Sequence, residues 1–114
     1  MQISESTHDG VVVIHLSGDV LGGPEAQAIN DHLRREVQAG NRKLVLDVSG
    51  VGLVNSSGLG LLIAGLTVVR NAGGDLRLAA PSSKLLKLLE VTKLSQVFSI
   101  YPDVQQAVQS FQTV

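Results

Sequence analysis

Hydrophobic positions follow two different periods along this chain, and the two periods predict where strands and helices lie. A β-branched run from Val11 to Leu16 follows Asp9-Gly10, a dipeptide typical of tight hairpins. We therefore expect an edge strand over about residues 2–7, a hairpin, and a central strand over about residues 11–17. The nearly continuous apolar run 43–48 predicts a strand that is covered on both faces.

Helical spacing of apolar residues, with polar residues on the other faces, predicts four helices. Pro24 is suited to the first turn of one helix, and Gly40 is suited to end it. The second helix is expected over about residues 57–71, and Pro81-Ser82 begins a short third one. Asp103 is a suitable N-cap for the last helix.

Two further strands, over about residues 75–80 and 97–101, complete the order β-β-α-β-α-β-α-β-α. Strands separated by helices pair in parallel through crossover connections. The pattern predicts an α/β fold with a mostly parallel five-strand sheet, an N-terminal antiparallel hairpin and about four helices. We expect residues 1–114 to form one domain.

Composition and charge exclude several classes of function. Nine basic and ten acidic residues give a formal net charge of −1, without the basic stripe that nucleic-acid binding requires. The longest apolar stretch, residues 59–69, is about half of the ~20 residues that a membrane span needs. The polar N-terminus lacks the positive region of a signal peptide, so we expect a cytoplasmic protein. With no Cys and three scattered His, we expect no metal site and no cofactor.

The segment Asn55-Ser56-Ser57-Gly58 lies between the strand expected at 43–48 and the second helix, where α/β sheets commonly place their sites. Asn and Ser are good N-cap residues, so one interpretation is that they only cap the helix. A second interpretation is a phosphorylation switch. A helix N-terminus tolerates a phosphate, which adds about −1.5 to −2 charges.

The second helix has an unusual outer side. Its expected core-facing residues are Leu59, Leu62, Ile63, Leu66 and Val69. The opposite side carries no charge and comprises Gly60, Leu61, Ala64, Thr67 and Val68. A small, weakly apolar outer face favours a docking surface for another protein, although a neighbouring segment of the same chain is an alternative.

Enzymatic chemistry is not indicated. A serine hydrolase elbow needs Gly-x-Ser-x-Gly, and the first Gly is missing around Ser56. His15 is expected on a strand face with Val11 and Val13, in a structural role. Gly58-Leu59-Gly60 is followed by neither a third Gly in register nor a Gly-Lys-Ser or Gly-Lys-Thr, so a nucleotide loop is not predicted. Weak binding of a small ligand at the loop stays open.

The run Asn55-Ser56-Ser57-Gly58-Leu59-Gly60, preceded by Lys43 to Val48, resembles the signature of STAS domains, and more narrowly that of bacterial anti-sigma factor antagonists. The resemblance extends over essentially the whole chain. It implies that Ser56 is phosphorylated by a partner anti-sigma factor serine kinase, which itself binds the ATP. It implies further that the unphosphorylated form binds this kinase and frees a sigma factor, and that a PP2C-like phosphatase reverses the modification.

One departure from the family pattern refines this expectation. Asn55 replaces the Asp that is usual in the family; it keeps the ability to cap but lacks the charge. The loop is then formed by Asn55, Ser57 and Gly58 around Ser56, and the expected partner contacts are Gly60, Leu61, Ala64 and Val68. The alternative function is an accessory subunit of a lipid-transport ABC complex, which would dock the same helix on an ATPase. A stressosome-type scaffold would carry an additional N-terminal domain, which we do not expect.

Overall fold

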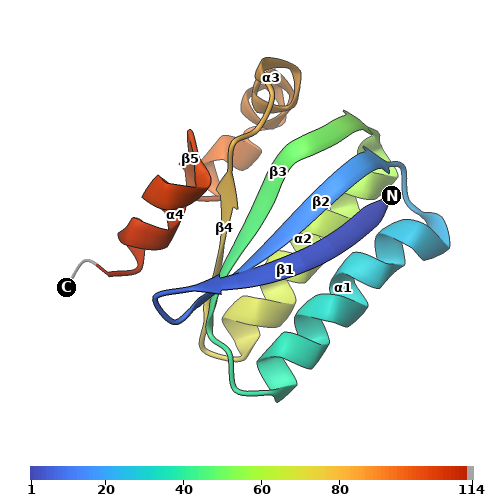
Figure 1. Ribbon diagram of the computed structural model, residues 1–114. Helices are drawn as coiled ribbons and strands as arrows, with labels where there is room; N and C mark the ends of the chain where they lie inside the picture. The colour runs from blue at the N-terminus through green and yellow to red at the C-terminus, as the bar shows by residue number, and fades with distance from the viewer. Residues whose placement is uncertain (113–114) are drawn as a thin grey trace.

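The computed structural model describes residues 1–112 and shows a five-stranded sheet with four α-helices (Figure 1). The sheet order is β1-β2-β3-β4-β5; β1 pairs antiparallel with β2, and the other pairs are parallel. The expected α/β fold class is confirmed. In chain order the elements are β1 (Gln2–His8), β2 (Val11–Val20), α1 (Gly23–Gln38), β3 (Lys43–Val54), α2 (Ser56–Asn71), β4 (Asp75–Ala79), α3 (Ser83–Val91), a 3-10 turn (Leu94–Gln96), β5 (Ile100–Tyr101) and α4 (Val104–Ser110).

Helices cover the two faces of the sheet unequally. On one face, Ile14 and Leu46 of the strands pack with Ile29 of α1 and Leu62 of α2 in the larger core cluster. On the other face, α4 packs over the middle of the sheet, where Val108 belongs to the smaller cluster. Figure 1 shows α1 and α2 side by side on one side of the sheet and α4 on the other. The parallel strands are therefore mostly apolar, as a doubly covered sheet requires.

Local sequence signals place the turns and helix ends. Asp9 and Gly10 both have positive φ, 53° and 79°, as a tight hairpin turn requires. The side chain of Ser82 accepts a hydrogen bond from the backbone N–H of Leu85, and that of Asp103 from the N–H of Gln106. The hairpin, the helix start at Pro81-Ser82 and the N-cap at Asp103 were predicted from the sequence, and the structure confirms them.

Three strand boundaries differ from the prediction. β3 continues to Val54 rather than ending at residue 48, and β2 continues to Val20 rather than residue 17. Both extensions contain glycines, which the sequence pattern reads as loop. Gly50 instead lies so close to Leu16 and Ser17 of β2 that a Cβ would approach them to 2.9 Å. The last strand is reduced to Ile100–Tyr101; a 3-10 turn at Leu94–Gln96 and the buried Phe98 precede it.

The helices of residues 1–112 include none with the length and apolar character needed to cross a membrane.

Candidate functional site

The loop between β3 and α2 is fixed by Asn55. Its backbone N–H donates to the carbonyl of Val20 at 3.3 Å, and its side-chain Nδ2 donates to the carbonyl of Leu21 at 3.0 Å. Its Oδ1 accepts from the backbone N–H of Gly58 at 2.8 Å, which caps α2. One amide side chain thus caps the helix and also joins the loop to the end of β2. A carboxylate at this position could accept the hydrogen bond from the Gly58 N–H but could not donate one to the Leu21 carbonyl.

Two glycines allow the loop and the end of β2 to approach closely. A Cβ on Gly58 would overlap the backbone carbonyl oxygen of Val20, so no larger residue fits without a backbone shift. Gly22, with φ +85°, faces Ser57, and a Cβ there would lie 2.7 Å from the Ser57 Cβ. Backbone contacts therefore fix the position of this loop.

Ser56 and Ser57 are exposed at the start of α2. Ser56 is the first residue of the helix, and the first turn contains no acidic side chain. The free N–H groups and the helix dipole create a partly positive environment for any group attached to the Ser56 hydroxyl. The arrangement presents a serine to solvent on a backbone that is held in place on both sides.

The outer face of α2 is only partly as expected. Gly60 and Ala64 are exposed, and Val68 is half-buried. Leu61 differs: it is half-buried and packs against the larger core cluster. On the opposite flank Gly65 is buried against α1, and a Cβ there would lie 2.7 Å from Asn30 Oδ1. The outer strip of α2, formed by Gly60, Ala64 and Val68, is consequently narrower than the sequence pattern predicts.

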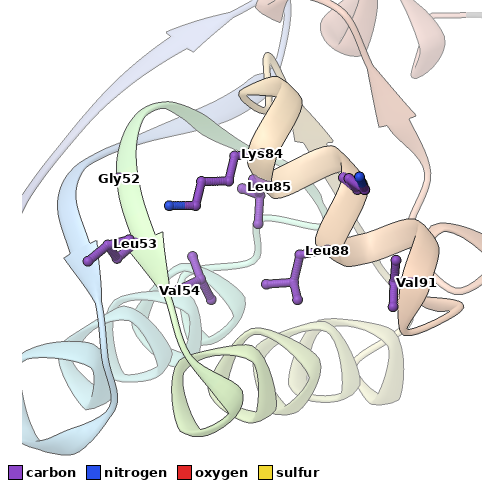
Figure 2. A pocket seen from close by; sticks show the side chains of 8 residues that line it. Gly52, Leu53, Val54, Lys84, Leu85, Leu88 and Val91 are labelled. Carbon is purple, nitrogen blue, oxygen red and sulfur yellow. The ribbon is translucent and has the colours of Figure 1, made fainter.

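Sequence reasoning did not find an apolar groove beside the loop. The groove, of about 340 Å³, lies between the end of β3 and α3. Figure 2 shows Val54 and Leu88 pointing toward one another across it, with Leu53 and Val91 at its edges. Leu53 is 50% exposed and Val91 72% exposed, so both contribute apolar surface. The complete lining is Gly52, Leu53, Val54, Lys84, Leu85, Lys87, Leu88 and Val91.

A hydrogen-bonded chain crosses the sheet face on the α4 side. His15 Nδ1 lies 2.7 Å from Asp47 Oδ2, and His15 Nε2 lies 2.9 Å from Ser6 Oγ. Burial raises the pKa of the Asp47 carboxyl, but hydrogen bonds from His15 and Ser49 outweigh burial and hold the pKa below its usual value. The order serine, histidine, aspartate matches a hydrolase triad, but Ser6 Oγ also lies 3.0 Å from His8 Nε2. The chain links β1, β2 and β3.

A second polar cluster joins β1 to α1. His32 Nε2 lies 2.7 Å from Glu5 Oε1 and 3.6 Å from Glu36 Oε1. The hydrogen bond with Glu36 lowers the pKa of Glu5, despite some burial. Burial and the neighbouring Glu5 raise the pKa of Glu36. The three histidines therefore have different surroundings, and His32 is the one that lies between two glutamates.

The structure combines a mixed sheet with an exposed serine at the start of α2, and the outer strip of α2 is uncharged. The chain is a small α/β protein with one mixed sheet. The STAS domain family model matches residues 2–107, and the chain belongs to the STAS domain family.

Relatives and solved structures carry related descriptions. The chain is 23% identical over 115 residues to the anti-sigma F factor antagonist of Paenibacillus polymyxa, covering 100% of this chain and 97% of that protein. An anti-sigma factor antagonist from Mycobacterium paratuberculosis matches with a TM-score of 0.84 and 25% identity, over 98% of this chain and 94% of that one. The Bacillus protein SpoIIAA has been solved unphosphorylated and phosphorylated; both forms match with a TM-score of 0.73 at 17% identity, over 99% and 96% of this chain and 100% and 99% of theirs.

Proposed function

We propose that this protein is an anti-sigma factor antagonist whose activity is switched by phosphorylation of Ser56. In its unphosphorylated form it binds an anti-sigma factor that is also a serine kinase, and so releases a sigma factor. The observation that carries this proposal is the exposed Ser56 at the first residue of α2, directly beside the uncharged outer strip of that helix. The names of its relatives support the same function.

The physical basis of the switch is a change of charge on a surface whose shape stays fixed. A phosphate on Ser56 adds about −1.5 to −2 charges at a helix N-terminus, where negative charge is favourable by about 0.3–1 kcal/mol. The loop therefore retains its conformation, and the effect falls on the partner, which would have to desolvate the phosphate. A nearly complete switch needs a difference of about 5.5 kcal/mol between the two forms.

Asn55, Ser57 and Gly58 have supporting roles in this proposal. They fix the backbone around Ser56 through the contacts with Val20, Leu21 and Gly22. Partner contact is assigned to Gly60 and Ala64, which are exposed, and to the exposed part of Val68. Leu61 contributes through its exposed part. A PP2C-like phosphatase would restore the binding form, and we place the cycle in the cytoplasm.

The first test is phosphorylation by a candidate anti-sigma factor serine kinase from the same genome, followed by intact-mass measurement and site mapping. We expect one phosphate at Ser56. Ser57→Ala is the matched control, because Ser57 is the adjacent exposed serine, and it should still accept one phosphate. Ser56→Ala should accept none. Continued phosphorylation of Ser56→Ala would place the phosphoacceptor elsewhere.

The second test measures binding of the same kinase by titration calorimetry. Ser56→Asp should abolish binding, and Ser56→Ala should bind whether or not ATP is present. Gln105→Asp is the charge control, since Gln105 is an exposed residue early in α4, on the opposite face of the sheet. Wild-type affinity of Ser56→Asp would contradict the switch. If an active kinase neither binds nor modifies the protein, docking on a transporter ATPase becomes the next function to test.

A further inference from the structure

We propose that Glu5, His32 and Glu36 form a binding site for a divalent transition-metal ion, of which Zn²⁺ is the representative. One ligand atom from each residue lies within 4.8 Å of the other two. Glu5 comes from the edge strand β1, whereas His32 and Glu36 are one turn apart on α1. The site is separate in sequence from the Ser56 loop and does not depend on the function proposed for that loop.

The distances within the cluster suit a small cation. Around a tetrahedral Zn²⁺, with bonds of about 2.0–2.2 Å to nitrogen and oxygen, neighbouring ligand atoms lie roughly 3.3 Å apart. The His32 Nε2 atom lies 2.7 Å from Glu5 Oε1 and 3.6 Å from Glu36 Oε1, which brackets this value. Small changes in side-chain rotamers would therefore place all three atoms around one ion. Water would complete the coordination.

Two of the three ligands, His32 and Glu36, are already held in position. The side chains of His32 and Glu36 are only 18% and 13% exposed, while that of Glu5 is 39% exposed. Asn41 Nδ2 donates to Glu36 Oε2 at 2.7 Å, which leaves Oε1 directed toward His32. A hydrogen bond of this kind orients a carboxylate ligand and strengthens its metal affinity. Glu5 then completes the site from the exposed side.

The charge of the cluster is not balanced by a permanent cation. Within residues 1–112, neither Glu5 nor Glu36 forms an ion pair with a Lys or Arg side chain; the only paired base is His32. Arg35 acts on Glu5 from a longer distance. Two carboxylates that share one imidazole repel each other unless a proton or a cation lies between them. A divalent ion satisfies both carboxylates and the ring nitrogen together.

The mixed donor set selects the kind of ion. Imidazole nitrogen with carboxylate oxygen suits Zn²⁺ and its late first-row neighbours, whereas Mg²⁺ prefers oxygen ligands and retains its water. With three protein ligands and partial exposure, the site should be weaker than a closed four-ligand structural site. A bound ion would connect β1 to α1 and stabilise the N-terminal hairpin.

The test is calorimetric titration of ZnCl₂ into the tag-free chain, with thermal unfolding measured in parallel. We expect one Zn²⁺ per chain with micromolar affinity, a rise in Tm, and no comparable effect of MgCl₂. His32→Gln and Glu36→Gln should each weaken binding about tenfold or more, because each removes a charged or coordinating ligand. Folding of both variants is checked by circular dichroism. If only one of them folds like the wild type, its Zn²⁺ affinity tests the proposal.

The matched control is His8→Ala, because His8 and His15 both contact Ser6 and form the competing histidine pair. This variant should bind Zn²⁺ like the wild type. Chemical-shift changes of the His32 ring on addition of Zn²⁺ give an independent readout. Binding that is lost in His8→Ala, binding that is unchanged in folded Glu36→Gln, or the absence of binding at 1 mM ZnCl₂ would each overturn the proposal.

Discussion

The contact between Gly58 and the end of β2 gives a sharp prediction for the Gly58→Ala variant. A methyl group at this position would overlap the backbone carbonyl oxygen of Val20, and that carbonyl cannot rotate away as a side chain would. Overpacking of this kind costs about 1–3 kcal/mol, and we expect the upper part of that range. The same substitution gains about 1 kcal/mol of helix propensity, which offsets part of the loss.

Gly60 provides the matched control on the same helix. A Cβ at Gly60 would meet nothing within 4 Å, so Gly60→Ala gains the helix propensity without a steric penalty. The difference in the free energy of unfolding between the two variants therefore isolates the steric term, at about 1–3 kcal/mol. Urea unfolding with a shared m-value measures this difference. If Gly58→Ala is as stable as Gly60→Ala, the close approach of the loop to β2 is wrong.

Three further predictions concern the loop, the outer strip of α2 and the sheet. Asn55→Ala should lower stability by about 1–2 kcal/mol in urea unfolding, since it removes a helix cap and the bond to Leu21; unchanged stability would contradict the dual role of this amide. Ala64→Arg should leave the unfolding midpoint within about 0.5 kcal/mol of the wild type, because Ala64 is exposed, while kinase binding by calorimetry falls at least tenfold. The lowered pKa of Asp47 stabilises the fold above the unfolded-state value of about 4, and this stability is lost as the pH falls through the folded value. Between pH 5 and about pH 3 the wild type should lose stability more steeply than Asp47→Asn, and parallel profiles would contradict the stabilising role of the Asp47 carboxylate.

Features that depend on neighbouring residues were predictable from the sequence. The turn at Asp9-Gly10 and the caps at Ser82 and Asp103 are each decided within four residues, and they lie where the sequence places them. The alternation of strands and helices likewise determines the crossover topology. The serine loop was located for the same reason, since capping residues directly precede the apolar period of α2.

Features that depend on contacts between distant segments were not predictable. Gly50 reads as a loop residue, and only the proximity of Leu16 and Ser17 explains why it belongs to β3. Gly65 falls outside the expected core face of α2, yet it is buried because α1 packs there. The groove of Figure 2 needs both β3 and α3 to exist, so no single stretch of sequence contains its pattern. Residues 43–54 form one long strand because β2, a distant segment of the sequence, pairs with β3 beyond residue 48.

The structural contacts around Ser56 explain why a switch at this position can act on a partner without changing the fold of the chain. The backbone N–H and the side-chain amide of Asn55 bond to the carbonyls of Val20 and Leu21, and Gly58 lies against the Val20 carbonyl. The conformation of the loop therefore does not depend on the Ser56 hydroxyl. That hydroxyl is exposed and forms no hydrogen bond within residues 1–112 that a phosphate would break. A modification at Ser56 can therefore add charge at the edge of the outer strip of α2 while the strip keeps its shape. Separation of the modified atom from the contacts that fix the loop is what the proposed cycle requires, because both forms must remain folded for the phosphate to be added and removed repeatedly.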